Sequence, residues 1–86
     1  MADQKPIETI RHGDVSASVW RNVSEEGKPF YNVTYQKRYK QDGETKYGGS
    51  FSPYDLDNLM RCTLDTRRYI MGRMKADRED EERPAA

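Results

Sequence analysis

The alternation of apolar and polar residues predicts two central strands. In the segment 15–21 the odd positions are apolar and the even positions are small or polar until Trp20 interrupts the pattern, as in a strand with one buried face. The segment 30–39 is rich in β-branched and aromatic residues, and its odd positions share one face. These strands are expected to pair as a hairpin across the polar loop 22–29.

Flanking segments predict two shorter strands. Residues 7–11 precede a bend at Gly13. Residues 45–51 follow the pair at 42–43, where glycine supplies the positive φ of a tight hairpin turn. Residues 1–6 are polar and are expected to be disordered.

A helix is predicted to begin at Ser52-Pro53. The Ser52 hydroxyl can accept from a free backbone N–H, Pro53 lacks an N–H that the first turn does not use, and Asp55 complements the positive helix end. Apolar residues of the segment 56–74 cover an arc of roughly 140°, wider than one contact line requires. One part of this arc is expected to meet the sheet and the rest a second copy of the helix. The fold class is therefore α+β, a four-stranded antiparallel sheet followed by one C-terminal helix.

Arg67 lies in the middle of this apolar arc. Its aliphatic stem can pack while the guanidinium reaches water or a carboxylate. Alternatively, the guanidinium forms an ion pair across a dimer interface. The sequence leaves both interpretations open.

Composition limits the hydrophobic core. The chain has 86 residues, enough for one small domain, and 34 % of them are apolar. Globular chains have roughly 45–50 %, a figure that also counts glycine. Small domains with thin cores add disulfides, metals or oligomerisation, but Cys62 is the single cysteine, and one His with one Cys cannot build a structural zinc site. Oligomerisation is what remains, and we expect no metal or cofactor.

The net charge is zero, but charge is distributed unevenly. Residues 75–86 carry three basic and five acidic side chains, 3 − 5 = −2, which leaves +2 on residues 1–74. This acidic tail has little to bury and is expected to be disordered, so the ordered domain is predicted to span residues 7–74. The chain lacks an apolar run of roughly 18 residues and the apolar segment of a signal peptide, so we expect a cytoplasmic protein that contacts no membrane.

The sequence offers little for catalysis. His12 has no catalytic partner recognisable by spacing and is expected in a loop, and Cys62 is expected to be a half-buried thiol on the helix. The chain also lacks a glycine-rich phosphate loop. We expect no enzymatic activity and no small-molecule substrate.

Aromatic and basic residues interleave at the end of the long strand. The segment 35–40 reads Tyr-Gln-Lys-Arg-Tyr-Lys, and Lys46 and Tyr47 return across the hairpin. Bases stack on flat rings with roughly 1–3 kcal/mol each, while cations neutralise phosphates, so this pattern suits single-stranded nucleic acid. The same residues also suit an ordinary solvated sheet edge.

Taken in order, these signals resemble the single-stranded-DNA-binding domain family of the transcriptional coactivator positive cofactor four, and more closely its short bacterial and phage members. The resemblance covers about 60 residues, from Ile10 to about Ile70. It rests on the Gly13 bend, the strand ending at Arg21, the strand 33–39 with its aromatic end, the turn Gly43-Glu44 followed by Lys46, and the Ser52-Pro53 helix start with Leu56 and Leu59.

The resemblance implies a homodimer paired through its helices. It also implies binding of single-stranded or melted DNA with little sequence preference, in transcription, replication or repair. By resemblance, Tyr39 takes the base-stacking position, and Arg21, Lys28 and Lys46 hold phosphates. With the residues added from the pattern itself, the predicted nucleic-acid-binding set is Trp20, Arg21, Lys28, Lys37, Arg38, Tyr39, Lys40, Lys46 and Tyr47. The predicted dimer interface is Leu56, Leu59, Met60, Thr63, Arg67, Ile70 and Met71.

The chain departs from the family pattern at two places. Val23 stands where the coactivator has an aromatic residue, so one stacking platform is either missing or replaced by Trp20 or Phe30, and in a shorter fourth strand the segment 47–49 replaces expected basic residues. Together with the zero net charge, these departures allow an alternative, a protein–protein interaction module on the same dimeric scaffold that does not bind nucleic acid.

Overall fold

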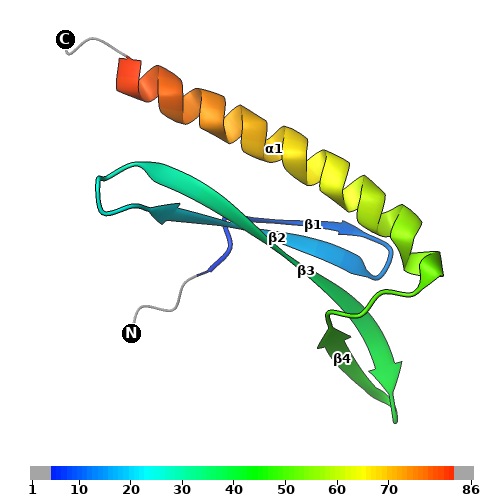
Figure 1. Ribbon diagram of the computed structural model, residues 1–86. Coiled ribbons are helices and arrows are strands. Elements are labelled where there is room, and N and C mark those ends of the chain that lie inside the picture. Colours follow the sequence, from blue (N-terminus) through cyan, green and yellow to red (C-terminus); the bar gives the residue numbers. More distant parts are fainter. Residues whose placement is uncertain (1–4, 83–86) are drawn as a thin grey trace.

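The computed structural model describes residues 5–82, with side chains up to residue 80. Its sheet is antiparallel, with the four strands side by side in chain order (Figure 1). The predicted α+β class and the order of four strands followed by one helix are confirmed. The elements are β1 (Glu8–His12), β2 (Val15–Val23), β3 (Pro29–Gln41), β4 (Glu44–Gly48), a short 3₁₀ turn η1 (Pro53–Asp55) and α1 (Leu56–Glu82).

The strand ends differ from the prediction by a few residues. The hairpin between β2 and β3 is longer than expected because pairing continues to Val23 and Pro29, and the backbone N–H of Ser24 closes the remaining loop on Lys28 O at 2.8 Å. The last strand ends at Gly48, although the prediction extended it to residue 51. Gly48 and its neighbour Gly49 carry no side chain that could pack on the sheet.

The helix is longer than predicted. Residues 75–82, expected to belong to the disordered tail 75–86, continue α1, and residues 83–86 lie outside the described residues. The reason is a tertiary contact: the Asp77 carboxylate accepts a hydrogen bond from the Tyr31 hydroxyl on β3. Composition does not reveal this contact, because the partners are 46 residues apart.

α1 packs on β1 and β2 with its small side chains. Val15, Ala17 and Val19 of β2 are completely buried, as is Cys62 on the helix, and Thr66 one turn later is 2 % exposed. Short side chains let the helix approach the sheet so closely that the Cys62 thiol donates to the carbonyl oxygen of Val15, with Sγ 3.5 Å away. Burial raises the pKa of this thiol.

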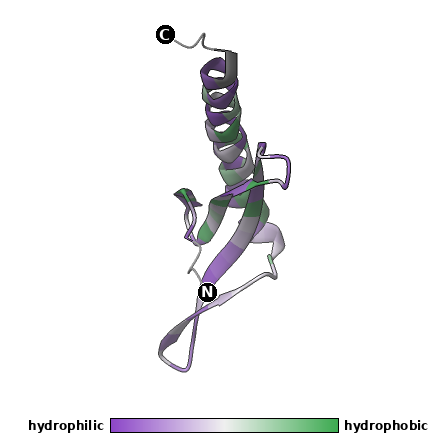
Figure 2. Cartoon of the chain, turned by 90° about the vertical axis from the view of Figure 1, so that its left-hand side faces the viewer, coloured by the Kyte–Doolittle hydropathy of each residue, from purple (hydrophilic) through white to green (hydrophobic). Residues whose placement is uncertain are grey.

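Most of the larger apolar side chains of α1 remain outside this contact, although Leu59 packs against the buried core. Figure 2 shows apolar segments recurring along the helix, and five large side chains are between 42 % and 64 % exposed. The sheet therefore meets the margin of the predicted apolar arc and leaves most of the arc uncovered. We call the uncovered part the helix stripe; it consists of Leu56, Met60, Leu64, Met71 and Met74.

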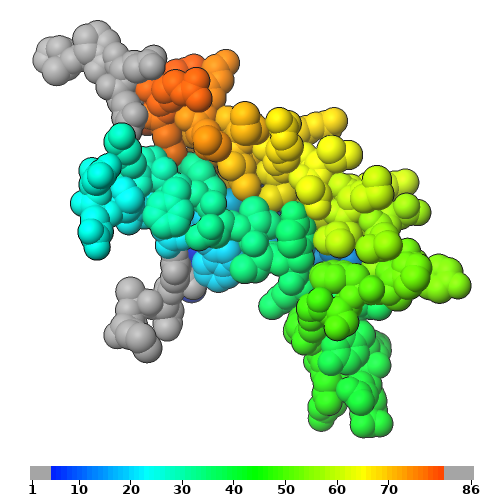
Figure 3. All heavy atoms as spheres, viewed as in Figure 1, coloured from blue at the N-terminus to red at the C-terminus, as the bar shows by residue number. Residues whose placement is uncertain are grey.

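The molecule is elongated. Its radius of gyration is 16.2 Å, whereas a compact domain of this length has about 12 Å. The hairpin of β3 and β4 projects beyond the part of the sheet that α1 covers (Figures 1 and 3). Across the described residues, no helix combines the length and the apolar character needed to cross a membrane.

Gly13 provides a test of the helix–sheet packing. It adopts φ +59° in the turn between β1 and β2, and a Cβ there would lie 2.5 Å from Asn58 Nδ2 on α1. Gly13→Ala should lower the free energy of unfolding by roughly 1–2 kcal/mol in urea titrations, because the left-handed backbone is strained and Asn58 must move. Gly49→Ala, with open space around it, is the control, and an equal loss in both variants would contradict this packing.

Candidate nucleic-acid interface

One face of the sheet lies opposite α1, and within residues 5–82 no other element covers it (Figure 1). Because side chains alternate along a strand and paired residues share a face, the register identifies every residue on it. We call this surface the outer face. Its residues are Thr9, Arg11, Ser16, Ser18, Trp20, Asn22, Phe30, Asn32, Thr34, Gln36, Arg38, Lys40, Thr45 and Tyr47.

The outer face is positively charged, although the net charge of the chain is zero. Its ionisable side chains are Arg11, Arg38 and Lys40, and none of its strand residues is a carboxylate. Its other residues are aromatic or carry hydroxyl or amide groups. The carboxylates of α1 lie on the opposite side of the sheet. The surface is therefore positive and polar, with three aromatic rings.

The aromatic rings of the outer face are accessible. Phe30 is 45 % exposed and Tyr47 is 55 % exposed. Trp20 is half-buried, and its indole N–H donates to Thr34 Oγ1 at 2.9 Å. This hydrogen bond orients the indole ring on the surface of the sheet.

Tyr39 and Lys46 lie directly opposite each other in the β3–β4 register. Their positions place them on the face of the projecting hairpin that continues the helix side of the sheet. Tyr39 is 40 % exposed, and its ring lies against Gly48. Two of the four residues given by the family resemblance, Tyr39 and Lys46, therefore lie together, but on the other face from Trp20.

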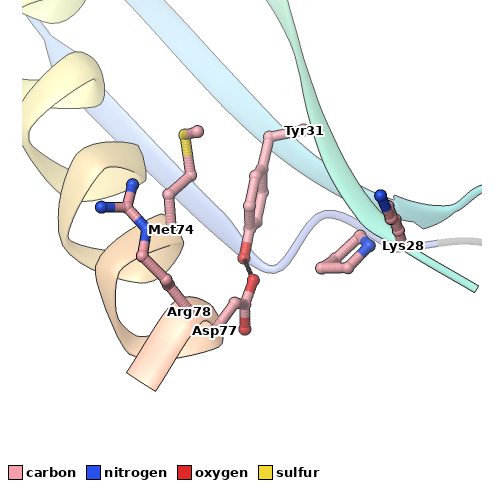
Figure 4. Close-up of a pocket in the computed structure, with 6 residues that line it drawn as sticks. Lys28, Tyr31, Met74, Asp77 and Arg78 are labelled. Atoms are coloured by element: carbon pink, nitrogen blue, oxygen red, sulfur yellow. Dashed lines mark hydrogen bonds between the residues drawn. The ribbon is translucent and has the colours of Figure 1, made fainter. Parts of the chain in front are cut away.

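Arg21 is engaged in holding the end of α1. Its Nη2 lies 3.5 Å from Asp77 Oδ1, and the Tyr31 ring projects from β3 so that its hydroxyl meets the same carboxylate (Figure 4). The hydrogen bond from Tyr31, and then the charge of Arg21, lower the pKa of Asp77. Hydrogen bonding with Tyr31 and the charge of Asp77 raise the pKa of Arg21. This guanidinium is not free to hold phosphate.

Lys37 is engaged at the start of the helix. Its Nζ lies 2.6 Å from Asp55 Oδ2, which also accepts from the backbone N–H of Ser52 at 2.8 Å and from its hydroxyl at 2.9 Å. The ammonium group of Lys37, followed by these Ser52 contacts, lowers the pKa of Asp55. Lys37 therefore ties β3 to the helix start.

Lys28 lies in the loop between β2 and β3. It lines a shallow hollow of about 200 Å³ beside Tyr31, Met74, Asp77 and Arg78, and Figure 4 shows Lys28 on the far side of Tyr31 from the helix. The loop adjoins the Phe30 end of the outer face, but Lys28 itself is not on one of its strands.

The structure thus divides the predicted binding set. It brings Trp20, Arg38, Lys40 and Tyr47 to the outer face and adds Arg11, which the sequence analysis missed. No local signal marks Arg11, because only the strand register places it beside the others. Tyr39 and Lys46 occupy the other face of the hairpin, Arg21 and Lys37 form ion pairs, and Lys28 stands apart in a loop.

Comparison with protein-family models, curated proteins and solved structures found no match to this chain. Its function is therefore inferred from its own residues and their geometry.

His12 has a partner that its sequence neighbours do not reveal. It ends β1, although the prediction placed it in a loop, and its Nε2 lies 2.7 Å from Asp65 Oδ2 on α1. Asp65 Oδ1 also lies 3.8 Å from Arg68. Within the described part of the chain, no three His, Cys, Asp or Glu side chains gather as a metal site. The His12–Asp65 contact ties β1 to the helix.

The two lowered carboxyl pKa values predict acid sensitivity. Since the pKa values of Asp55 and Asp77 are lowered in the folded chain, their contacts stabilise the fold above the unfolded pKa, and this stability is lost as the pH falls through the folded pKa values. The Tm should therefore fall as the pH is lowered below about 5, with a smaller fall in Asp77→Asn than in the wild type. Glu26→Gln, a substitution in an exposed loop, should show the same fall in Tm as the wild type. If Asp77→Asn also showed the same fall in Tm as the wild type, the role of the Asp77 contact would be contradicted.

Proposed function

We propose that this protein binds single-stranded or melted DNA through the outer face, with little sequence preference and without a catalytic step. The observation that carries the proposal is the gathering of three aromatic rings and three cations, with no carboxylate among the strand residues, on one sheet face that no other described element covers. Rings supply stacking and cations neutralise phosphates, the two contributions on which non-specific single-strand binding depends. Transcription, replication and repair are the processes that expose such strands.

The chemistry of the outer face favours unpaired bases over a duplex. A duplex hides the faces of its bases, so rings such as Trp20 and Tyr47 gain stacking energy only with a single strand. Hydroxyl and amide side chains around Trp20, such as Ser18, Asn32 and Thr34, can hydrogen-bond to base edges of more than one kind. This combination supports binding that tolerates many sequences.

The site is long enough for several nucleotides. Phe30 and Arg38 are both on the outer face of β3, and their separation along an extended strand is roughly 27 Å. Trp20 lies across the sheet from Asn32, near the Phe30 end, and Tyr47 lies opposite Arg38. A strand crossing the face would meet aromatic rings near both ends.

A homodimer paired through the helices forms the scaffold of this proposal. One chain buries only small apolar side chains and exposes the five large ones of the helix stripe, a combination typical of an interface. Beside the stripe runs an apolar groove of about 290 Å³ between α1 and β3, because α1 covers β1 and β2. The groove is lined by Val33, Tyr35, Thr63, Thr66, Arg67, Ile70 and Met71.

A second copy of α1 is the occupant that this surface suits best. In a two-fold dimer the same surface of each chain packs against its counterpart. The helix stripe of one chain would therefore pack against the groove and the helix stripe of the other. Arg67 lies exposed within this surface, where it can reach a carboxylate of the second copy. The outer faces of both copies then point away from the helix layer, which gives the dimer two separate binding surfaces.

Trp20 offers a direct measurement of binding, since it is the single tryptophan of the chain. An oligothymidylate of about 20 nucleotides should quench its fluorescence by stacking, and a duplex of equal length should bind more weakly. The logarithm of the binding constant should fall with the logarithm of salt concentration, with a slope of about −0.7 per phosphate contact. Equal affinity for single strand and duplex would contradict the proposal.

Substitutions test which face binds. Trp20→Ala should weaken binding of a labelled oligothymidylate by about 1–3 kcal/mol, measured by fluorescence anisotropy, and Trp20→Phe should restore part of the loss by keeping a ring. Tyr54→Ala is the control, because Tyr54 is 91 % exposed at the helix start, away from the outer face. A larger loss in Tyr39→Ala than in Trp20→Ala would place the site on the other face of the hairpin.

The dimer has an independent test in sedimentation. Leu64 is 55 % exposed, so Leu64→Glu leaves the fold of one chain intact but places a charge in the proposed interface. We expect the wild type to sediment as a dimer and Leu64→Glu to shift toward the monomer. The variant should also have a lower Tm, because it loses the stability that association adds to the folded chain. Arg61→Glu, an exposed substitution on the polar side of α1, should stay dimeric. A wild-type monomer at high concentration would contradict the scaffold.

A further inference from the structure

A polar hollow lies where the outer face continues onto the projecting hairpin. It has a volume of about 450 Å³ and is lined by Asp14, Arg38, Tyr39, Lys40 and Thr45. Lys40 pairs directly with Thr45 across β3 and β4, and Arg38 lies two residues earlier on the same face. Two cations and one hydroxyl are therefore adjacent within a concave surface.

Asp14 is the one carboxylate that lines this hollow. The turn between β1 and β2 is fixed beside β3, because the backbone N–H of Arg38 donates to Asp14 O at 2.8 Å. Asp14 Oδ1 lies 3.4 Å from Arg38 Nη2, and the two side chains are 59 % and 44 % exposed. The backbone contact holds Asp14 in place, while solvent screens the side-chain ion pair and keeps it weak.

We infer that the hollow is a phosphate subsite of the single-stranded nucleic-acid surface. In the free protein the Asp14 carboxylate pairs with the Arg38 guanidinium, and a bound phosphodiester displaces it. This inference rests on the proposed function. A phosphodiester carries the same charge as the carboxylate and can accept two parallel hydrogen bonds from a guanidinium. Lys40 adds a second cation and Thr45 a hydroxyl, neither of which Asp14 engages. The phosphate therefore gains more contacts in the hollow than the carboxylate makes.

Asp14 limits affinity under this arrangement. Binding must first break the Arg38 pair, and the displaced carboxylate stays near the phosphate because its backbone is anchored. Removing the charge of Asp14 releases Arg38 and abolishes the repulsion. Asp14→Asn should therefore strengthen binding, the opposite of what loss of a ligand contact produces.

A double-mutant cycle tests this inference. Binding of a labelled oligothymidylate of about 20 nucleotides is measured by anisotropy at about 50 mM and about 200 mM NaCl for the wild type, Asp14→Asn, Arg38→Gln and the double variant. Asp14→Asn should tighten binding by about three- to tenfold at the lower salt and steepen the salt slope by about 0.7. Arg38→Gln should weaken binding, and adding Asp14→Asn to it should then restore little.

Asp57→Asn is the matched control, because it removes the same charge from the exposed first turn of α1. Its affinity should equal that of the wild type. If Asp57→Asn raised the affinity as much as Asp14→Asn does, the effect would come from net charge alone, and the inference would be overturned. The same would follow if Asp14→Asn raised the affinity equally in the Arg38→Gln background.

The outcomes also separate the inference from the proposed function. Wild-type binding that Asp14→Asn leaves unchanged refutes the subsite alone. Absence of binding by the wild type and by every variant at both salt concentrations refutes the proposed function, and the subsite with it.

Discussion

The close contact between the small side chains of α1 and the central strand β2 determines the arrangement of the chain. Cys62 and Thr66 allow the helix to lie directly on Val15 and Ala17, and the thiol hydrogen bond to the backbone fixes that approach. Because the contact is narrow, α1 covers half of the sheet and directs its large side chains away from it. The uncovered helix stripe, the groove beside β3 and the elongated shape all follow from this packing.

Ion pairs near the two ends of α1 also hold the helix on the sheet. Both are formed by cationic side chains on the face of the sheet that α1 covers. Arg21 pairs with Asp77 near the helix end, and Lys37 pairs with Asp55 at its start. The carboxylates that hold the helix thus neutralise the inner cations, while Arg38 and Lys40 on the outer face keep exposed positions. A chain of zero net charge acquires one positive surface through strand alternation and not through composition.

The two uncovered surfaces have different chemistry and therefore suit different partners. The helix stripe is apolar, and in the proposed dimer a second copy of the same helix would cover it without burying charge, apart from Arg67. The outer face is polar, cationic and aromatic, which suits a charged polymer with exposed rings. Since the two surfaces lie on opposite sides of one sheet, the proposed dimerisation and the proposed nucleic-acid binding would not compete for area. The hollow at Arg38 lies at the edge of the outer face, where Asp14 is anchored beside the guanidinium.

Local sequence determined the elements of this protein, because the signals for them lie within a few residues. Alternation in 15–21 and 30–39, the bend at Gly13 and the Ser52-Pro53 helix start predicted the strands and the helix start, with errors of a few residues at the strand ends. The tertiary structure decided which residues share a surface. A one-residue shift of register would exchange the two faces of a strand. Only the strand pairing therefore shows that Trp20 and Tyr39 lie on different faces and that Arg11 belongs to the outer face. Likewise, Asp77 extended the helix through the predicted tail and engaged Arg21 because its partners lie on distant strands, beyond the reach of any local pattern.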